Sequence, residues 1–233
     1  MILYYIRHGH PIYQPDSLTP LGIKQSEALA KKLGKIEFDE IYSSTSNRAI
    51  MTAKPTCDAL GKEPVLLDFA HEGYAWRDLT IESVETKGKV WLHQDKRIIS
   101  LFNSKEIRDL GDRWYDHPKL NDYEKGISRI YNEADAFLKE LGYEHIRYTG
   151  RYKITKPNDK RIALFAHQGF GLAFLSCITD IPYPMFCTHF DMCHTGVTVI
   201  DFDEIDGFST PKILTLSSDA HLYSEGVETN YKY

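Results

Sequence analysis

The chain has 233 residues, enough for one large domain with a full hydrophobic core, or for one domain with an insertion. Hydrophobic residues make up 42% and charged residues 26%, which excludes a disordered or fibrous protein. With 28 basic and 33 acidic residues the net charge is -5, so the overall charge does not point to a nucleic acid or an anionic membrane. An anionic substrate would need a local concentration of positive charge.

The N-terminus and the cysteines indicate a cytoplasmic protein. Residues 2–6 are apolar, but no basic leader precedes them and the run is too short for a signal-peptide core or a membrane span. There are four cysteines, and Cys57 lies far in sequence from the other three. A disulfide framework is therefore not expected, and we predict free thiols in a reducing compartment.

Strands and helices alternate over residues 2–68. The first apolar run predicts a buried strand that ends at Arg7-His8-Gly9. Thr19 and Pro20 supply an N-cap and a first-turn proline for a helix that Gly34 closes. The predicted elements are strands at 2–6, 38–44 and 65–68 and helices at 20–33 and 46–60, the second capped by Ser46 and kinked or made irregular by Pro55.

The same alternation returns in the last third of the chain. Residues 161–166 predict an apolar strand that runs into His167, followed by a helix over about 170–178. Two late strands are predicted at 197–202 and 213–216. Strands that alternate with helices favour an α/β sandwich with a largely parallel sheet.

The middle stretch, residues 73–160, breaks this alternation and is richer in charged and aromatic residues. Its clearest element is a helix over about 123–141, because Ile127, Ile130, Ala134 and Phe137 share one face with two further apolar residues. We interpret 73–160 as a partly helical cap insertion within a single domain spanning 1–233. Such a cap would lie over the carboxyl edge of the sheet, where ligands bind in folds of this kind.

Phosphoryl transfer needs a nucleophile, donors around the phosphoryl oxygens, and an acid for the leaving oxygen. Arg7-His8-Gly9 joins a histidine to a guanidinium that can bind phosphate and a glycine that lets the backbone approach closely. Three residues alone prove little, but Arg48 follows the second predicted strand and His167 follows a later one. Several strand ends therefore converge on one place.

Short motifs, in this order, resemble those of the histidine phosphatase, or phosphoglycerate mutase-like, superfamily. They are Arg7-His8-Gly9, Leu18-Thr19-Pro20-Leu21-Gly22, Ser43-Ser44-Thr45-Ser46-Asn47-Arg48-Ala49, Thr52-Ala53 and Ala166-His167-Gln168-Gly169, and Asp219-Ala220-His221-Leu222 is similar to the family's C-terminal segment. The motifs cover both ends of the chain and leave the middle stretch unmatched. The resemblance implies a three-layer sandwich with a mostly parallel central sheet.

The resemblance also implies roles for individual residues. His8 would be the nucleophile that is transiently phosphorylated, and Arg7, Arg48 and His167 would hold the phosphoryl oxygens. Glu72 falls after the third predicted strand, where the family's first branch carries its proton donor.

Three carboxyl groups are candidates for the acid. The other large branch has an aspartate directly after the second histidine, where this chain has Gln168, and that favours Glu72. The sequence after Glu72 departs from the usual family pattern, so Asp68 and Asp78 are the alternative acids. Glu72 would otherwise be an ordinary exposed loop carboxylate.

His10 and Gln168 are candidate substrate contacts. The mutases and fructose-bisphosphatases of the family usually follow the first glycine with Glu-Ser and then an asparagine, whereas this chain has His10-Pro11-Ile12-Tyr13-Gln14. A mutase therefore loses support. His10 is either an additional phosphate or substrate contact or a histidine at the rim of the site.

Two other groups of residues invite a functional interpretation. Cys187, His189, Cys193 and His194 are of zinc-ligand type, but their spacing lacks the paired Cys-x-x-Cys of common structural sites, and the resemblance implies no metal and no other cofactor. His194 could instead approach the phosphate pocket.

The basic and aromatic residues of the middle stretch allow two interpretations. They could form a lid that binds an anion beside an apolar or aromatic group, or they could belong to an ordinary amphipathic helical segment with a charged face in solvent. The residues are Trp76, Arg77, Trp91, His93, Lys96, Arg97, Arg108, Arg113, Trp114 and Tyr115.

The predicted function is that of a metal-independent phosphatase that hydrolyses a small phosphomonoester through a phosphohistidine on His8. Neither a nucleic acid nor a membrane is an expected partner. A phosphoglycerate-type mutase is one alternative. A non-catalytic, phosphate-binding regulatory protein is the other, although such relatives usually lose a residue of the phosphate pocket and all four are present here.

Overall fold

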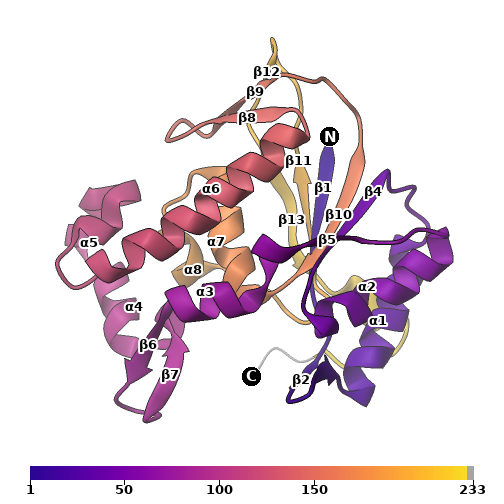
Figure 1. Cartoon of the computed structure of the whole chain (residues 1–233), viewed down its shortest axis with the longest axis horizontal. Helices are drawn as coiled ribbons and strands as arrows, with labels where there is room; N and C mark the ends of the chain where they lie inside the picture. Colours follow the sequence, from indigo (N-terminus) through magenta and orange to yellow (C-terminus); the bar gives the residue numbers. More distant parts are fainter. Residues whose placement is uncertain (230–233) are drawn as a thin grey trace.

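A six-stranded sheet forms the middle layer of the molecule in the computed structural model, which describes residues 1–229 (Figure 1). Its strand order is β13-β11-β1-β10-β4-β5. The strands are β1 (Ile2–Arg7), β4 (Glu40–Ser44), β5 (Val65–Leu67), β10 (Arg161–Ala166), β11 (Val197–Asp201) and β13 (Lys212–Ser218). The pairs β1/β10, β10/β4 and β4/β5 are parallel, and β11 is antiparallel to both of its neighbours. The prediction of a mostly parallel sheet is confirmed.

Helices cover both faces of this sheet, which makes the three layers visible in Figure 1. The helices are α1 (Pro20–Leu33) and α2 (Asn47–Leu60) on one face, and α6 (Glu124–Glu140), α7 (Gln168–Thr179) and α8 (Tyr183–His189) on the other. Side chains alternate along a strand, so β1 contributes to two cores. Leu3 and Tyr5 are buried with residues of α6 and α7, whereas Ile6 is buried with Leu29 and Leu33 of α1.

Both N-terminal helices begin close to where the sequence predicts. The Thr19 side chain accepts a hydrogen bond from the Gly22 amide, 3.1 Å away, as an N-cap residue does. Ser46 occupies the N-cap position of α2, but its hydroxyl donates to Asp16 and makes no capping bond to its own helix. The cap comes from Asp16, whose Oδ2 accepts from the Asn47 amide at 2.8 Å.

Helix α2 continues through Pro55, where the sequence predicts a kink or an irregularity, to Leu60. Proline lacks an amide hydrogen and removes one bond of the helix. The neighbouring residues Thr52, Ala53, Thr56 and Cys57 are all buried, so packing holds this turn of the helix in place.

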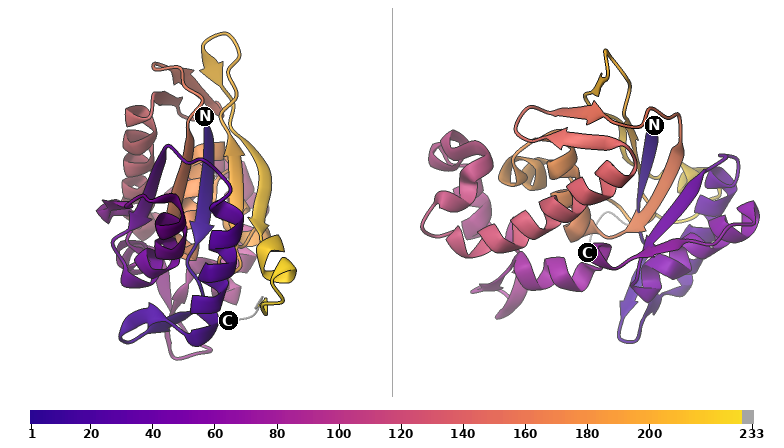
Figure 2. Two further views of the ribbon diagram at one scale, coloured as in Figure 1. Left: turned by 90° about the vertical axis from the view of Figure 1, so that its right-hand side faces the viewer. Right: turned by 45° about the horizontal axis from the view of Figure 1, so that its top comes forward.

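The middle stretch is partly helical, as predicted, and its long helix α6 lies within one residue of the predicted boundaries at each end. The other elements of this stretch are α3 (Glu72–Asp78), β6 (Thr80–Ser83), β7 (Gly88–Trp91), α4 (Lys96–Phe102), α5 (Lys105–Leu110), β8 (Tyr143–Ile146) and β9 (Arg151–Ile154). Strands β8 and β9 join β12 (Phe208–Ser209) in a small sheet near the amino end of β1 (Figure 2).

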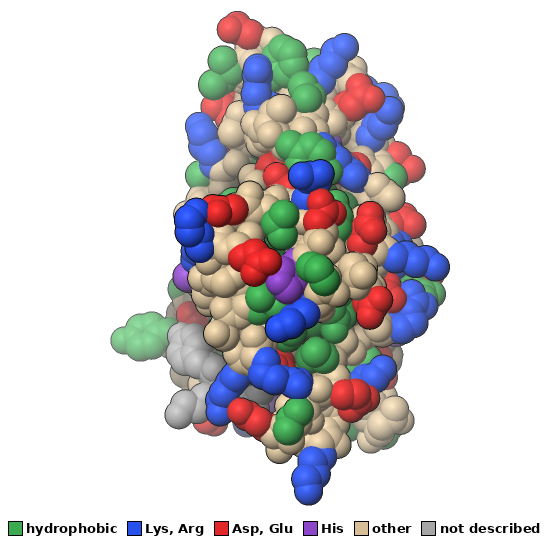
Figure 3. Space-filling model, turned by 90° about the vertical axis from the view of Figure 1, so that its left-hand side faces the viewer, with side chains coloured by type: hydrophobic (Ala, Val, Ile, Leu, Met, Phe, Trp, Pro, Cys, Tyr) green, Lys and Arg blue, Asp and Glu red, His purple; other side chains and the backbone are tan. Residues whose placement is uncertain are grey.

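Several of the basic and aromatic residues of this stretch are engaged in the core or in ion pairs. Trp91 and Trp114 are buried in the core. Lys96, Arg97 and Arg113 form ion pairs with Glu85, Asp95 and Asp116, respectively. Basic and acidic side chains are interspersed over the face of the molecule shown in Figure 3. These features fit the amphipathic alternative, in which an apolar side is buried and a charged side faces solvent.

A buried histidine connects β8 to helix α6 and to the C-terminal end of α7. His145 Nδ1 lies 2.8 Å from Asp135 Oδ1, and Nε2 lies 3.2 Å from Asp180 Oδ2. Its ring stacks on Tyr152 with the centroids 4.2 Å apart. Burial lowers the pKa of His145, but the bonds to Asp135 and Asp180 outweigh it and raise that pKa to about 9. The charged imidazolium is therefore the form that the folded protein favours.

We expect this histidine to make the stability of the fold depend on pH. A folded-state pKa of about 9, above the ordinary value of 6.5, stabilises the fold fully below pH 6.5, and the stabilisation is lost as pH rises through 9. The loss should reach about 2–3 kcal/mol. Urea unfolding at several pH values measures it.

His145→Gln should remove this component of the pH dependence. The exposed His189 provides the matched control, because His189→Gln should leave the slope of the wild type intact. A His145→Gln variant that retained the full slope between pH 6.5 and 9 would contradict the assignment.

Candidate active site

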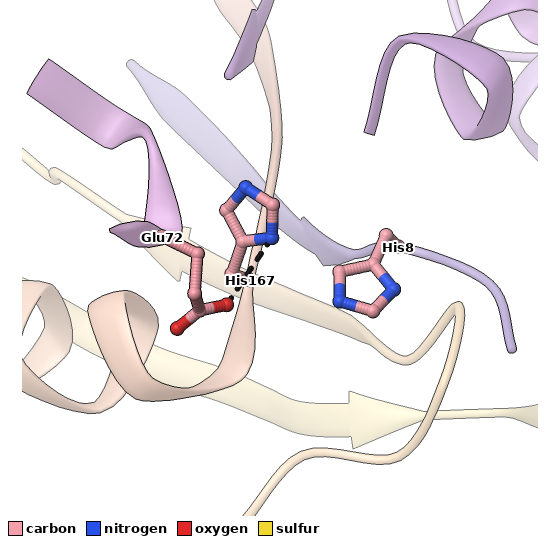
Figure 4. Close-up of side chains that lie close together, drawn as sticks. All are labelled: His8, Glu72 and His167. Atoms are coloured by element: carbon pink, nitrogen blue, oxygen red, sulfur yellow. Dashed lines mark ion pairs between the residues drawn. The ribbon is translucent and has the colours of Figure 1, made fainter. Parts of the chain in front are cut away.

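The candidate residues come from four places where strands give way to helices. His8 directly follows β1, Arg48 lies in the first turn of α2 after β4, His167 follows β10, and Glu72 is the first residue of α3. The carboxyl ends of parallel strands lie at the same edge of a sheet. The structure accordingly brings one ring nitrogen of His8, one of His167 and a carboxyl oxygen of Glu72 within 4.8 Å of one another (Figure 4).

The His8 ring is held in one orientation by its own loop. Nδ1 lies 2.7 Å from the Gly9 carbonyl oxygen, which can only accept, so Nδ1 carries the hydrogen and donates it. Nε2 therefore keeps its lone pair, and it lies on the side of the ring that faces Glu72 and His167 (Figure 4). Burial and the charges of Arg7 and Arg48 hold the pKa of His8 well below its ordinary value. The ring is therefore neutral at neutral pH.

Two glycines bring the loop after β1 against the start of α1. A Cβ on Gly9 would lie 2.8 Å from the Gly22 carbonyl oxygen, and a Cβ on Gly22 would lie 2.2 Å from the His10 carbonyl oxygen. Both distances are too short for any other residue. The Gly9 amide also donates to Thr52 Oγ1 of α2 at 3.0 Å. These close contacts explain why Gly9, in the motif of residues 7–9, and Gly22, in the motif of residues 18–22, are glycines.

Asp16 orients Arg48, and the sequence analysis missed it. Arg48 Nη1 donates to Asp16 Oδ1 at 2.8 Å, and Asp16 Oδ2 accepts from Ser46 Oγ at 2.7 Å. Burial raises the pKa of Asp16, but the bonds to Arg48 and Ser46 outweigh it and lower that pKa. The carboxylate comes from the hairpin of β2 (Pro11–Tyr13) and β3 (Asp16–Leu18), and no spacing in the sequence connects it with α2.

His167 is buried and has polar contacts on both ring nitrogens. Nδ1 lies 3.1 Å from Arg48 Nη2, which can only donate, so Nδ1 accepts and Nε2 carries the hydrogen. Nε2 lies 2.8 Å from Ser44 Oγ. The Tyr5 hydroxyl fixes the backbone, because it donates to the His167 carbonyl at 2.6 Å and accepts from its amide at 3.2 Å. Burial, His8 and Arg48 hold the pKa of His167 well below its ordinary value.

Glu72 supplies a carboxyl group that exchanges protons near neutral pH. Its side chain is 14% exposed, Oε1 accepts from the Phe170 amide at 3.1 Å, and Oε2 lies 3.2 Å from His167 Nδ1. Burial raises the pKa of Glu72 to about 7, although Arg48 and the Phe170 amide act in the opposite direction. A carboxyl group with such a pKa can act as acid and as base at neutral pH.

The two alternative acids have other partners. Asp78 accepts from Arg77 Nε at 2.7 Å and from Arg129 Nε at 3.0 Å, and its pKa is lowered because these bonds outweigh its burial. Asp68 accepts from the Tyr74 hydroxyl at 3.0 Å. The geometry therefore favours Glu72 as the acid.

Arg7 is oriented by the loop that precedes β11. Its side chain is buried, Nη1 donates to the Met192 carbonyl, and Nη2 lies 3.1 Å from His194 Nε2, which must accept. Burial and the charge of Arg7 lower the pKa of His194 to about 3. His194 thus approaches the pocket from the segment before β11, with its ring 5.8 Å from that of His8.

The two candidate substrate contacts lie at the edge of this cluster. His10 Nδ1 is 3.0 Å from Thr19 Oγ1, and the ring, which is partly exposed, lies 5.2 Å from that of His194. Gln168 is buried, and its amide donates to Asp191. His10 therefore lies at the edge of the cluster and faces His194, whereas Gln168 joins α7 to the loop that orients Arg7.

The residues of zinc-ligand type do not converge. Cys187 Sγ contacts the Pro184 carbonyl, Cys193 Sγ contacts Ser217, His189 contacts Arg108, and His194 contacts Arg7. A different trio, His8, Glu72 and His167, has metal-ligand atoms close enough to share an ion. Arg7 and Arg48 would repel a divalent cation there, so the charges favour an anion.

The other trio within residues 1–229, Asp135, His145 and Cys177, is already committed to its own contacts. His145 bonds to Asp135, and Arg147 Nε donates to the same carboxylate at 2.6 Å. A cation would have to displace a guanidinium and an imidazolium.

Residues 3–116 match the family model of the histidine phosphatase superfamily (branch 1). The resemblance is confirmed over these residues. The chain is also similar to a protein of Hydrogenobacter thermophilus named as a phosphoserine phosphatase, with 37% identity over 73 residues, which cover 28% of this chain and 36% of that relative. The match thus spans about a third of the relative's length.

Solved structures share the fold over nearly the whole chain. A phosphoserine phosphatase mutant from Entamoeba histolytica in complex with phosphoserine is 20% identical, with 95% of this chain and 98% of that chain covered and a TM-score of 0.61. A mycobacterial glucosyl-3-phosphoglycerate phosphatase is 16% identical, with 93% and 98% covered and a TM-score of 0.57. These likenesses establish the three-layer fold of the phosphoglycerate mutase-like structures.

No helix in residues 1–229 is both long enough and apolar enough to cross a membrane.

Removing the Asp16 carboxylate should destabilise the protein and loosen Arg48. We expect Asp16→Ala to lower the free energy of unfolding by about 1–2 kcal/mol, because the cap of α2 and the bond to Arg48 are both lost. The same variant should bind inorganic phosphate more weakly than the wild type. Urea unfolding and calorimetric titration with phosphate measure the two effects.

Asp58→Ala is the matched control on the same helix. Asp58 forms an exposed i,i+4 pair with Lys54 at 2.8 Å, so its loss should change stability by less than about 0.5 kcal/mol. Equal effects of the two substitutions would show that Asp16 has no special role.

Proposed function

We propose that this protein is a phosphatase that hydrolyses a small phosphomonoester through a phosphohistidine on His8. The observation that carries the proposal is the neutral His8 ring, with its Nε2 lone pair facing Glu72, beside the guanidiniums of Arg7 and Arg48. The confirmed family resemblance and the names of the similar proteins support the same class of reaction.

In the first step, the lone pair of His8 Nε2 attacks phosphorus and the bond from phosphorus to the ester oxygen breaks. Glu72, protonated because its pKa is about 7, gives its proton to the leaving oxygen. Arg7 and Arg48 bind the phosphoryl oxygens and stabilise the charge that spreads over them in the transition state. His167 binds a phosphoryl oxygen as its other tautomer, with the hydrogen on Nδ1 and with Nε2 accepting from Ser44 Oγ. The products of this step are the alcohol and the phosphoenzyme.

In the second step, water attacks the phosphohistidine. Glu72, now a carboxylate, takes a proton from the water, and the bond from His8 Nε2 to phosphorus breaks to release phosphate. A pKa near the working pH allows the same carboxyl group to act first as acid and then as base. The residues of this chain therefore supply every proton transfer, and the proposed reaction needs no cofactor.

The proposed substrate is small and carries one phosphoryl group. Similar proteins are named for phosphoserine and for glucosyl-3-phosphoglycerate, which are both small phosphorylated compounds. We also propose that residues 73–160 act as a cap, since α3, which carries Glu72, begins this stretch and packs on α7. Its remaining residues would then select the alcohol part of the substrate.

Substituting His8 tests the nucleophile. We expect His8→Ala to lower the rate of hydrolysis of an aryl phosphate, measured in the presence of a chelator, by about 10³-fold or more. Acid-labile phosphate should be trapped on the wild type and not on the variant. His189→Ala, at an exposed histidine, should match the wild type.

The same experiment separates the alternatives. Equal rates for His8→Ala and the wild type would refute the nucleophile assignment. Isomerisation of phosphoglycerate without phosphate release would favour a mutase. Absence of both turnover and labelling over a broad panel of phosphoesters would favour a non-catalytic phosphate-binding protein.

The pH dependence tests Glu72 as the acid. Because the protonated form donates, kcat/KM for an alkyl phosphate should fall as pH rises through about 7. Glu72→Gln should remove this inflection and lower kcat/KM by about 10²-fold or more for the alkyl phosphate. The loss should be much smaller for a nitrophenyl phosphate, whose leaving group needs little protonation.

Asp78→Asn provides the matched control, because Asp78 belongs to a separate ion-pair cluster. It should retain the inflection near pH 7. If Asp78→Asn removed the inflection and Glu72→Gln did not, the acid would be Asp78.

A further inference from the structure

The loop of residues 192–196 holds both Arg7 and His8 through their backbone as well as through the Arg7 side chain. The Thr195 amide donates to the His8 carbonyl at 3.3 Å, and the Arg7 amide donates to the Gly196 carbonyl at 3.3 Å. Met192 and His194 of the same loop contact the Arg7 guanidinium. One loop therefore sets the positions of Arg7 and His8.

This loop contains a residue in an unfavourable backbone conformation. Thr195 has a φ of 56°, in the left-handed region, and it is fully buried. A β-branched side chain rarely adopts this conformation, because its Cβ crowds the following carbonyl oxygen. Contacts of the surrounding structure must hold Thr195 there.

His221 provides such a contact. Thr195 Oγ1 donates its single hydrogen to the His194 carbonyl at 2.7 Å, so the hydroxyl accepts from His221 Nε2, which lies 3.0 Å away. His221 is buried, and its Nδ1 has no hydrogen-bond partner within residues 1–229. Burial and the charge of Lys32 lower the pKa of His221 to about 4. The ring is neutral at neutral pH, and its one N–H points at Thr195.

The helix that carries His221 is anchored independently of this bond. His221 belongs to α9 (Ala220–Ser224), which packs on α1. The neighbouring Leu222 is fully buried, and its carbonyl accepts from the Val227 amide at 2.9 Å. α9 is therefore a fixed support from which the imidazole reaches the loop.

We propose that His221 is a positioning residue for the nucleophile: its bond to Thr195 keeps the 192–196 loop in the conformation that aligns Arg7 and His8. The inference rests on the proposed function, because alignment of His8 affects a rate only if His8 attacks phosphorus. His221 acts through Thr195 and has no contact with the phosphoryl group. A small displacement of a reacting group can cost about 10²-fold in rate.

Two substitutions at this position separate the hydrogen bond from the packing. His221→Met keeps a side chain of similar length but removes the donor, whereas His221→Gln retains an N–H that can reach Thr195. We expect His221→Met to lower kcat for an aryl phosphate by about ten- to a hundredfold with little change in KM. His221→Gln should regain a large part of the loss.

Phe38→Leu is the control for a merely structural role, because Phe38 is buried before the amino end of β4, at the opposite edge of the sheet from the site. It should lower the free energy of unfolding, yet leave kcat unchanged at a temperature where unfolding curves show the protein to be folded. Thr195→Val removes the acceptor hydroxyl, and adding His221→Met to that variant should cause no further loss of kcat.

The outcomes distinguish this inference from the proposed function. If the wild type is active and His221→Met is equally active while folded, the positioning role is overturned and the function stands. Additive losses in the double variant, or no rescue by His221→Gln, would also overturn it. If the wild type releases no phosphate from any ester, the proposed function fails and the positioning role fails with it.

Discussion

The site depends on two permanently charged guanidiniums that lie almost entirely out of water. Arg7 and Arg48 are 3% and 8% exposed, and arginine does not lose its proton in proteins. Charges in such surroundings are weakly screened, so they act strongly on neighbouring ionisable groups and on any anion that enters. The fold holds them with directed acceptors, of which Asp16 on Arg48 and the Met192 carbonyl on Arg7 are examples.

Burial explains why the pKa values of the ionisable groups of the site shift in opposite directions, because it disfavours the charged form of each group. Burial and the guanidiniums both disfavour a proton on His8 and His167, so both rings are neutral. Burial also disfavours the charged form of Glu72, and it outweighs the attraction of Arg48. A free lone pair on His8 and a proton on Glu72 are the separate nucleophile and acid that the proposed double displacement needs.

The sequence predicted the parts of the site that follow the ends of strands, since His8 and His167 each come directly after an apolar run and parallel strands align those ends. It could not predict contacts that depend on how loops close. Asp16 and Arg48 are 32 residues apart, and Arg7 and Met192 are 185 apart, with no periodicity that relates them. The same limit made the cysteines and histidines near residue 190 resemble zinc ligands, because spacing does not show where side chains point.

The two histidines are fixed relative to each other by the sheet itself. In the parallel pair β1/β10, Arg7 lies opposite Ala166, so the residues that follow, His8 and His167, leave the sheet side by side. Tyr5 strengthens this link, because its hydroxyl, carried on β1, bonds to both the amide and the carbonyl of His167. Groups built on rigid, neighbouring strands lose little further freedom when a substrate binds. The central sheet thus places His8 and His167 side by side before any loop contributes.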